Sequence, residues 1–314
     1  MHFADRVIDA VRRAGNAVLV GIDPRPDHLP HSLQARFACD RRGIASALEA
    51  FAKGVIDVVA PLVPAVKFQT AYFEAYGPEG LAALHAAARY ARHAGLIVII
   101  DGKRNDIGST AEAYARAYLR QVNVEEPCEP AWDADALTIN PYLGSDGVRP
   151  FVTHAERAGK GVFVLVRTSN PSAGEFQDLV ADGRPLYRHV AERLAEWAAP
   201  HRGRSGYSLV GAVVGATYPR ELEELRSALP GVLFLVPGYG AQGATACDVA
   251  AAFDTEGLGA VINSSRGVTF AYERPDLLER FGADWQAAIA QAVHEMIDDL
   301  ARHTSAARLR RESH

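Results

Sequence analysis

The sequence predicts a single-domain α/β protein with a (β/α)8 TIM-barrel fold. Eight short apolar runs recur along the 314 residues, and segments with helical spacing of apolar residues lie between them. Most runs lack polar alternation, which is typical of parallel strands buried on both faces. A doubly wound open sheet is the main alternative, but it usually needs fewer strands, and the even spacing favours the barrel.

The expected elements alternate along the chain. The strands are the apolar runs 17–22, 65–68, 96–100, 136–139, 161–166, 209–214, 232–236 and 259–262. The helices, where apolar residues recur at helical spacing, are 44–59, 78–94, 111–119, 186–198, 219–228 and 244–253. Segments 24–43 and 168–185 are expected to be long loops after the first and fifth strands, and long loops in a barrel tend to be functional.

Composition and charge exclude several classes of protein. Hydrophobic residues make up 48% of the chain and charged residues 23%, which are ordinary globular values. The net charge is −5, whereas a nucleic-acid-binding protein needs a basic face. No apolar run approaches the roughly 20 residues of a membrane span, and the first residues lack a signal-peptide pattern. Cys39, Cys128 and Cys247 are scattered, which favours a reducing compartment and structural thiols.

We therefore expect a soluble, cytoplasmic protein that binds neither nucleic acid nor membrane. No linker or shift in composition divides the chain, so residues 1–300 are expected to form one barrel domain. Residues 301–314 are polar and basic, and we expect them to fray as a C-terminal tail.

Polar side chains follow every expected strand, at the end where barrel enzymes place their active sites. In chain order they are Asp23, Lys67, Asp101 with Lys103, Asn140, Thr168 with Ser169, Thr217, Gln242 and Arg266. Lys67 lies within the second strand, and the others follow their strands. Convergence of polar groups on one rim supports a site more strongly than any single residue does.

The densest group of charges follows the third strand. Asp101 and Lys103 are two residues apart, so along an extended segment they project into one space, with Lys67 on the neighbouring strand. Charges at the mouth of a buried strand are costly unless paired. The group is either a structural ion-pair lattice or a catalytic array.

The last two loops indicate a phosphate site. Glycines in 237–243 and 263–267 let backbone N–H groups approach an anion, and expected helix N-termini add a favourable dipole. Arg266 offers a planar fork for phosphate oxygens, and Gln242 offers an amide donor. The alternative is that the glycines only form tight turns.

No metal or nucleophile motif stands out. The histidines are scattered without ligand spacing, and Gly-x-Ser-x-Gly is missing. Asp23 and Asp101 are able to share a magnesium ion, but Lys67 and Lys103 already supply positive charge there.

The run from Asp101 to Thr110 resembles a known family signature. Asp101-x-Lys103-x-x-Asp106-Ile107-x-x-Thr110 resembles the Asp-x-Lys-x-x-Asp-Ile signature of the orotidine 5′-phosphate decarboxylase family. The longer string, with 167–171 and 237–242, resembles its type 2 bacterial branch. The resemblance implies decarboxylation of orotidine 5′-phosphate (OMP) to UMP and CO2 in de novo pyrimidine biosynthesis, with no cofactor and no metal.

The resemblance also implies a shared site in a homodimer. Lys67, Asp101, Lys103 and Asp106 match the family's alternating Lys-Asp-Lys-Asp array. Lys103 is expected to stabilise a carbanion at C6 of the pyrimidine and to protonate it. Asp106, with Thr110, is expected to serve the partner's site.

The remaining candidates are substrate contacts. They are Asp23 for a ribose hydroxyl, Thr168 or Ser169 for the pyrimidine edge, Gln242 and Arg266 for the phosphate, and Asn140 at the end of the fourth strand. Two other functions stay open: a different phosphosugar decarboxylase or aldolase on the same barrel that uses Mg²⁺, and a phosphometabolite-binding barrel without chemistry.

Overall fold

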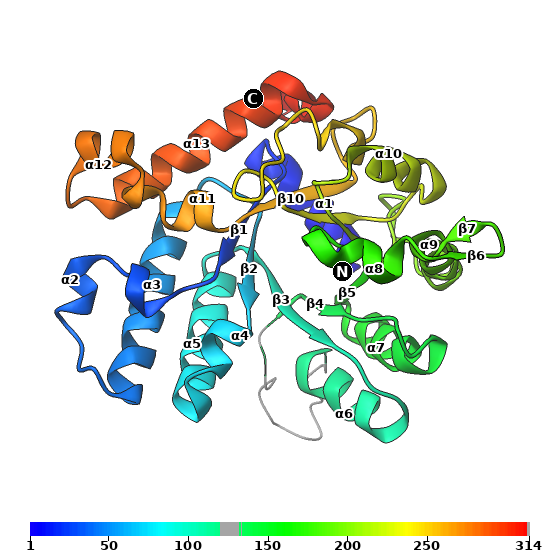
Figure 1. Cartoon of the computed structure of the whole chain (residues 1–314), viewed down its shortest axis with the longest axis horizontal. Helices are drawn as coiled ribbons and strands as arrows, with labels where there is room; N and C mark the ends of the chain where they lie inside the picture. Colours follow the sequence, from blue (N-terminus) through cyan, green and yellow to red (C-terminus); the bar gives the residue numbers. More distant parts are fainter. Residues whose placement is uncertain (120–131, 133, 313–314) are drawn as a thin grey trace.

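Eight parallel strands close into a barrel, so the predicted (β/α)8 fold is confirmed (Figure 1). The structure is a computed structural model, and it describes residues 1–119, 132 and 134–312. Around the barrel the strand order is β1-β10-β9-β8-β5-β4-β3-β2. The strands are β1 Val18–Ile22, β2 Ala65–Gln69, β3 Ile97–Arg104, β4 Ala136–Ile139, β5 Gly161–Arg167, β8 Val210–Val214, β9 Phe234–Pro237 and β10 Ala260–Ser264.

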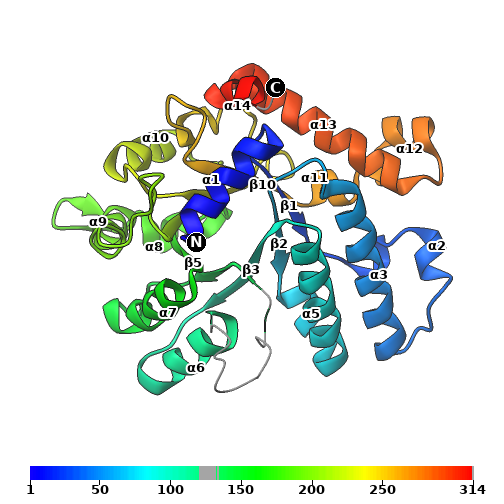
Figure 2. The same cartoon turned by 180° about the vertical axis from the view of Figure 1, so that it is seen from behind.

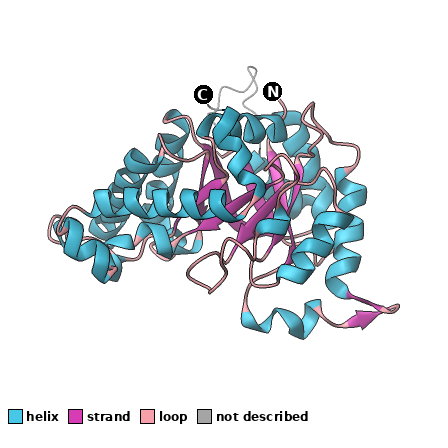
Figure 3. Cartoon of the chain, turned by 90° about the horizontal axis from the view of Figure 1, so that it is seen from above, coloured by secondary structure: helices cyan, strands magenta, loops and turns pink. Residues whose placement is uncertain are grey.

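Helices surround the strands on the outside of the barrel (Figure 3). The longer ones are α1 Phe3–Ala14, α3 Arg41–Val59, α5 Gly77–His93, α6 Gly108–Leu119, α7 Ser145–Ala158, α9 Leu186–Ala198, α10 Pro219–Ala228 and α13 Trp285–His303. The short helices and 3-10 turns are η1 Pro26–His28, α2 His31–Gln34, α4 Ala71–Glu74, η2 Pro171–Ala173, α8 Gly174–Gln177, η3 Ala250–Ala252, α11 Arg266–Thr269, η4 Ala271–Glu273, α12 Pro275–Phe281, η5 Ser305–Arg308 and α14 Leu309–Glu312.

The barrel strands are apolar because both of their faces are covered. All five residues of β1 are buried, and so are all five of β8. Their inner faces fill the barrel, and their outer faces pack under the helices. This double burial explains why the strands were recognisable as continuous apolar runs.

Helix α1 closes one end of the barrel, and it lies in front of the strands in Figure 2. Phe3 packs edge-on against Phe163 of β5, with ring centroids 6.0 Å apart. Arg6 pairs with Asp135, the residue before β4. These contacts place α1 at the amino ends of the strands, so the opposite end is left for the site.

The two predicted long loops contain short elements. The first holds η1 and α2, and the second holds η2, α8 and an antiparallel hairpin of β6 Val180–Ala181 and β7 Arg184–Pro185. The hairpin projects from the edge of the molecule (Figure 3). The β6 residues are exposed, so this hairpin is outside the core.

The predicted helix over 244–253 is wrong, because only the 3-10 turn Ala250–Ala252 forms there. The Asp248 carboxylate accepts hydrogen bonds from the backbone N–H and the hydroxyl of Thr245, both at 2.7 Å. Side-chain bonds of this kind compete with helical hydrogen bonding. The apolar residues still face the core, but from a turn-rich segment.

The expected fraying from Ala301 is also wrong for residues 301–312. Helix α13 runs to His303, and η5 and α14 follow it. Leu309 and Ala306 are buried, and the Ser305 hydroxyl donates to the Asp254 carbonyl at 2.7 Å. Apolar anchors therefore hold this part of the tail against the barrel.

Among the helices that the described residues form, none combines the length and apolar character needed to cross a membrane. Cys39 and Cys247 are exposed and unpaired, and Cys128 lies outside the described residues.

Candidate active site

A cavity of about 550 Å³ opens at the carboxyl ends of the barrel strands. Each barrel strand, or the residue directly after it, contributes a side chain to its lining. In the strand order of the sequence these are Asp23, Lys67, Asp101 and Lys103, Thr138, Leu165, Val213, Leu235 and Asn263. The volume lies in the range of pockets that enclose a small-molecule ligand.

The carboxylate of Asp101 is the centre of the polar network, and it is 7% exposed. Its Oδ1 accepts hydrogen bonds from Lys103 Nζ and Thr138 Oγ1, both at 2.7 Å. Its Oδ2 lies 3.1 Å from Lys67 Nζ and accepts from Gln69 Nε2 at 3.2 Å. A carboxylate has about four acceptor positions, so this one is fully satisfied.

Burial and charge oppose each other in this network. Burial alone raises the pKa of Asp101, but Lys67, Lys103 and the Thr138 hydroxyl outweigh it and hold that pKa well below its usual value. Burial also lowers the pKa of Lys67, yet the carboxylates of Asp23 and Asp101 leave it raised. Both groups therefore stay charged near neutral pH, as a buried ion pair requires.

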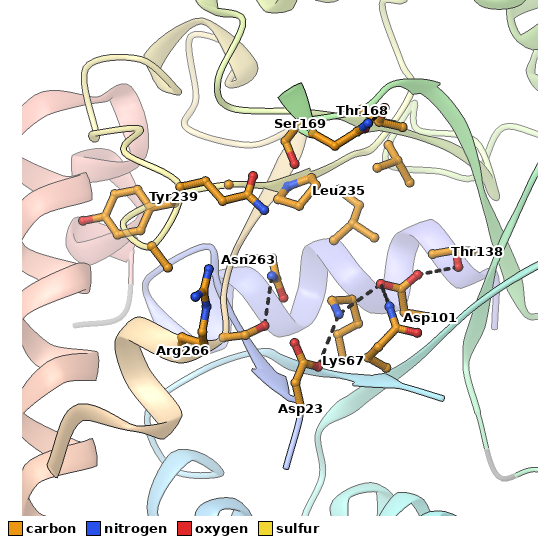
Figure 4. Close-up of a pocket in the computed structure, with 18 of the residues that line it drawn as sticks. Asp23, Lys67, Asp101, Thr138, Thr168, Ser169, Leu235, Tyr239, Asn263 and Arg266 are labelled. Atoms are coloured by element: carbon orange, nitrogen blue, oxygen red, sulfur yellow. Dashed lines mark hydrogen bonds and ion pairs between the residues drawn. The ribbon is translucent and has the colours of Figure 1, made fainter. Parts of the chain in front are cut away.

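Lys67 joins two carboxylates across the cavity floor. Its Nζ lies 3.8 Å from Asp23 Oδ1 and 3.1 Å from Asp101 Oδ2. Asp23 Oδ1 is buried, and no described residue offers it a hydrogen bond. Asn263 Oδ1 is likewise buried, and no described residue donates a hydrogen bond to it. These two oxygens are acceptors that donor groups of a ligand are able to fill (Figure 4).

Lys103 reaches the network from an unusual backbone. Its φ is +45°, in the left-handed region that residues with a Cβ rarely adopt. The prediction that Asp101 and Lys103 share one space is confirmed by their 2.7 Å contact. The reason is different, however, because the register of β3 against β4 shifts between Ile100 and Arg104, and the strand is not regular there.

The other end of the cavity is formed by the glycine-rich loop after β9 and by the end of β10. Figure 4 shows Tyr239 and Arg266 at this end, well separated from Asp101 and Thr138. Gly238 has φ +108°, and a Cβ there would lie 3.1 Å from Gln242 Oε1. Glycine is thus required at this position, and it lets the loop turn back toward the cavity.

Arg266 and Gln242 line this end as predicted. Among the described residues, none pairs with the guanidinium of Arg266, which is exposed to the cavity. The expected helix dipoles are largely missing, because no α-helix directly follows β9 and α11 has only four residues. Any anion bound here therefore depends on side chains and loop N–H groups.

Thr168 and Ser169 border the cavity from the loop after β5 (Figure 4). The side chain of Gln177 fixes Thr168, since it accepts from the Thr168 N–H at 3.0 Å and donates to the Thr168 hydroxyl at 2.8 Å. Buried Arg167 anchors the same loop: its guanidinium lies 3.9 Å from the Tyr218 ring centroid and pairs with Asp178.

Most of the predicted site residues come together, and three do not. Those that line the cavity are Asp23, Lys67, Asp101, Lys103, Thr168, Ser169, Gln242 and Arg266. Asp106, Thr110 and Asn140 lie outside its lining. Asp106 accepts from the N–H of Ile107, and Asn140 accepts from that of Tyr142. Their substrate contacts stay predictions.

Sequence reasoning missed Thr138 and Gln177, and it assigned no individual role to Gln69 or Asn263. Thr138 carried a signal, because it is the single hydroxyl in the buried run 136–139. Among the described residues, no three His, Cys, Asp or Glu side chains are grouped so as to hold a metal ion. The expectation of a metal-free reaction is not tested by that arrangement.

The family model, the related sequences and the solved structures that match this chain agree with one another. Residues 19–281 match the family described as Orotidine 5′-phosphate decarboxylase / HUMPS family. The orotidine 5′-phosphate decarboxylase of Rhodopirellula baltica is 48% identical over 302 residues, which cover 96% of this chain and 99% of that protein. That of Caldicellulosiruptor bescii is 41% identical over 277 residues, covering 87% and 91%. The solved OMP decarboxylase of Leishmania donovani superposes with a TM-score of 0.73 at 32% identity, covering 96% and 98%.

Proposed function

The chain belongs to the orotidine 5′-phosphate decarboxylase family, and from this membership we propose how its cavity performs the reaction. It is a carboxy-lyase that converts OMP to UMP and CO2 in pyrimidine biosynthesis. The observation that carries the mechanism is the Asp101 carboxylate held between two lysines at one end of a nucleotide-sized cavity.

The proposed chemistry needs only the charges of the chain. The bond between C6 of the pyrimidine and its carboxylate breaks, CO2 leaves, and the electron pair stays on C6. A preorganised ammonium group stabilises that charge more effectively than water does. Lys103 then transfers a proton from Nζ to C6, which gives UMP, and it recovers the proton from solvent. No cofactor takes part in this scheme.

Lys103 suits this role because it is held and also accessible. Its Nζ is anchored to Asp101 at 2.7 Å, while its side chain is 44% exposed and lines the cavity. Lys67 is 5% exposed at its side chain and is locked between Asp23 and Asp101, so it serves as a fixed charge. Asp101 orients both ammonium groups and lies near the departing carboxylate.

The rest of the cavity is proposed to hold the substrate. Arg266 and Gln242 bind the phosphate, and Thr168 or Ser169 reads the pyrimidine edge. Asp23 accepts a hydrogen bond from a ribose hydroxyl at Oδ1, to which no described residue donates a hydrogen bond. Phosphate contacts far from C6 supply binding energy that favours the transition state.

We further propose a homodimer in which Asp106 and Thr110 complete the partner's site. Both residues lie outside the cavity of their own subunit. Apolar side chains are exposed around them: Ile107 is 53%, Leu143 44% and Tyr142 80% exposed. Such a group of exposed apolar residues is suited to an interface.

The direct test of the function is the change in ultraviolet absorbance when OMP becomes UMP. The purified protein is expected to show it, and a chelator is expected to leave the rate unchanged. A protein that binds UMP but leaves OMP intact would contradict the proposal, and inhibition by the chelator would favour a metal-dependent reaction.

The shared site has a separate test. Lys103→Ala and Asp106→Ala proteins are each expected to be inactive, and mixing them should restore part of the activity, because some mixed dimers hold one intact site. Demonstrated subunit exchange without recovered activity would show that Asp106 acts within its own subunit.

A further inference from the structure

We propose that Thr138 is a positioning residue for the reaction, whose single hydroxyl fixes both the backbone of Lys103 and the carboxylate of Asp101. Thr138 lies on β4 between two buried aliphatic residues and is 1% exposed. A buried hydroxyl has to be hydrogen-bonded to be tolerated. The partners that it finds are the two residues at the centre of the proposed chemistry.

The direction of these hydrogen bonds follows from what each group is able to donate. The Asp101 carboxylate, already paired with two ammonium groups, only accepts. The one proton of the Thr138 hydroxyl is therefore given to Asp101 Oδ1 at 2.7 Å. Its lone pair accepts the N–H of Lys103 at 3.0 Å. The hydroxyl thus links donor and acceptor in one defined orientation.

The register of the two strands explains why Lys103 needs this partner. Ile100 pairs with Leu137, and Arg104 pairs with Ile139. Three residues of β3, 101–103, therefore face the single residue Thr138 of β4. This β-bulge interrupts the ladder between the two strands at Lys103. The N–H of Lys103 finds its partner in the Thr138 hydroxyl, at 3.0 Å.

The bulge also carries strain. Lys103 has φ +45°, which brings its Cβ close to the following carbonyl. A residue stays in that region only if its surroundings hold it there. Regular pairing resumes directly afterwards, where the Asn140 N–H donates to the Arg104 carbonyl at 3.0 Å. The bulge is thus held at residue 104 by the ladder and at residue 103 by Thr138.

The consequence for catalysis rests on the proposed role of Lys103. The Thr138 hydroxyl holds both ends of Lys103. The Lys103 N–H donates to it directly, and Lys103 Nζ donates to the same Asp101 oxygen, Oδ1, that the hydroxyl binds. Without the hydroxyl, the Lys103 N–H loses its partner and Asp101 loses one of its donors. The ammonium group then shifts relative to C6. The phosphate contacts at Arg266 and Gln242 are not part of this chain of bonds, so substrate binding should be spared.

The test compares Thr138→Val, which keeps the shape, Thr138→Ala, which removes the hydroxyl without adding a methyl group against Asp101, and Thr138→Ser, which restores the hydroxyl. A misplacement of about 1 Å in an active site costs roughly a hundred-fold in rate. We expect kcat to fall about 10- to 100-fold in the valine and alanine variants, with KM and UMP affinity within about three-fold of wild type. The serine variant should recover most of kcat.

Ser208→Ala is the matched control. Ser208 is also fully buried, and its hydroxyl donates to the Ala198 carbonyl at 2.8 Å, but it lies before β8 at the other end of the barrel. It should lower the melting temperature without changing kcat.

The proposal is overturned if either loss variant, shown to be folded by UMP binding, keeps kcat within about three-fold of wild type. It is also overturned if the serine variant fails to restore kcat. A fall in kcat that is accompanied by a rise in KM and a loss of UMP affinity in both folded loss variants would overturn it as well. The activity of the wild-type protein toward OMP is measured before any variant is compared. An inactive wild-type protein would contradict the proposed function itself.

Discussion

Replacing Lys67 by Met should destabilise the protein far more than a loss of one surface charge does. Lys67 is 4% exposed, and its ammonium lies 3.1 Å from Asp101 Oδ2 and 3.8 Å from Asp23 Oδ1. The methionine side chain has a similar volume and leaves no large hole. The effect is therefore electrostatic, because two carboxylates remain in the cavity floor with less positive charge to balance them.

The magnitude follows from what stays behind. Removing one partner of a buried ion pair costs about 3–5 kcal/mol, since the other charge remains buried. Asp101 keeps Lys103, Thr138 and Gln69, so we expect the lower end, about 3 kcal/mol. For a chain of this size that corresponds to a decrease of about 5 °C in melting temperature.

The assay is urea unfolding followed by circular dichroism, with Lys53→Met as the matched control. Lys53 forms an i,i+4 pair with Glu49 at 2.6 Å, but its side chain is 37% exposed. Pairs of that kind contribute at most about 0.5 kcal/mol. If Lys67→Met lowers the free energy of unfolding by no more than Lys53→Met does, the buried ion pairs of Lys67 do not stabilise the fold.

Two further predictions concern pH and the phosphate. The pKa of Asp101 is held below its usual 3.8, so its pairing contributes stability that is fully present above about pH 4 and is lost as the pH falls through the lower folded-state pKa. The urea midpoint should fall on acidification below pH 4, and Asp101→Asn should flatten that decline; an unchanged slope would refute the linkage. Arg266→Ala should lower kcat/KM for OMP about 10- to 100-fold, because a charged hydrogen bond contributes about 1.5–3 kcal/mol. With orotidine, which lacks the phosphate, variant and wild type should match, and a loss there as well would place Arg266 elsewhere in the mechanism.

The strands were predictable because barrel strands are buried on both faces, and continuous apolar runs follow directly from that burial. Helices were harder to predict. α7 follows Gly144 and α1 follows His2, and neither of these residues caps its helix with a side chain, so neither helix showed the usual start signal. The segment 244–253 had helical spacing, but Asp248 bonds to Thr245 and forms a turn instead.

The candidate site was predictable where the interacting residues lie on the same strand. Asp101 and Lys103 lie two residues apart, and the sequence alone places them together. The contribution of Thr138 depends on the register between β3 and β4, with 37 residues of chain separating it from Asp101. Gln177 likewise reaches Thr168 only after the loop folds back. Such contacts between segments are set by tertiary packing, which periodicity does not encode.

Lys103 shows how the two levels are connected. Strand alternation predicted that its side chain joins Asp101, yet the backbone there is not that of a regular strand. A bulge interrupts the pairing of β3 with β4 and places a lysine at φ +45°. Local propensity is violated here, and a hydroxyl on the neighbouring strand compensates for it. Violations of this kind are expected where function constrains the backbone. The position at which the sequence-based geometry fails is therefore the position of the proposed proton donor.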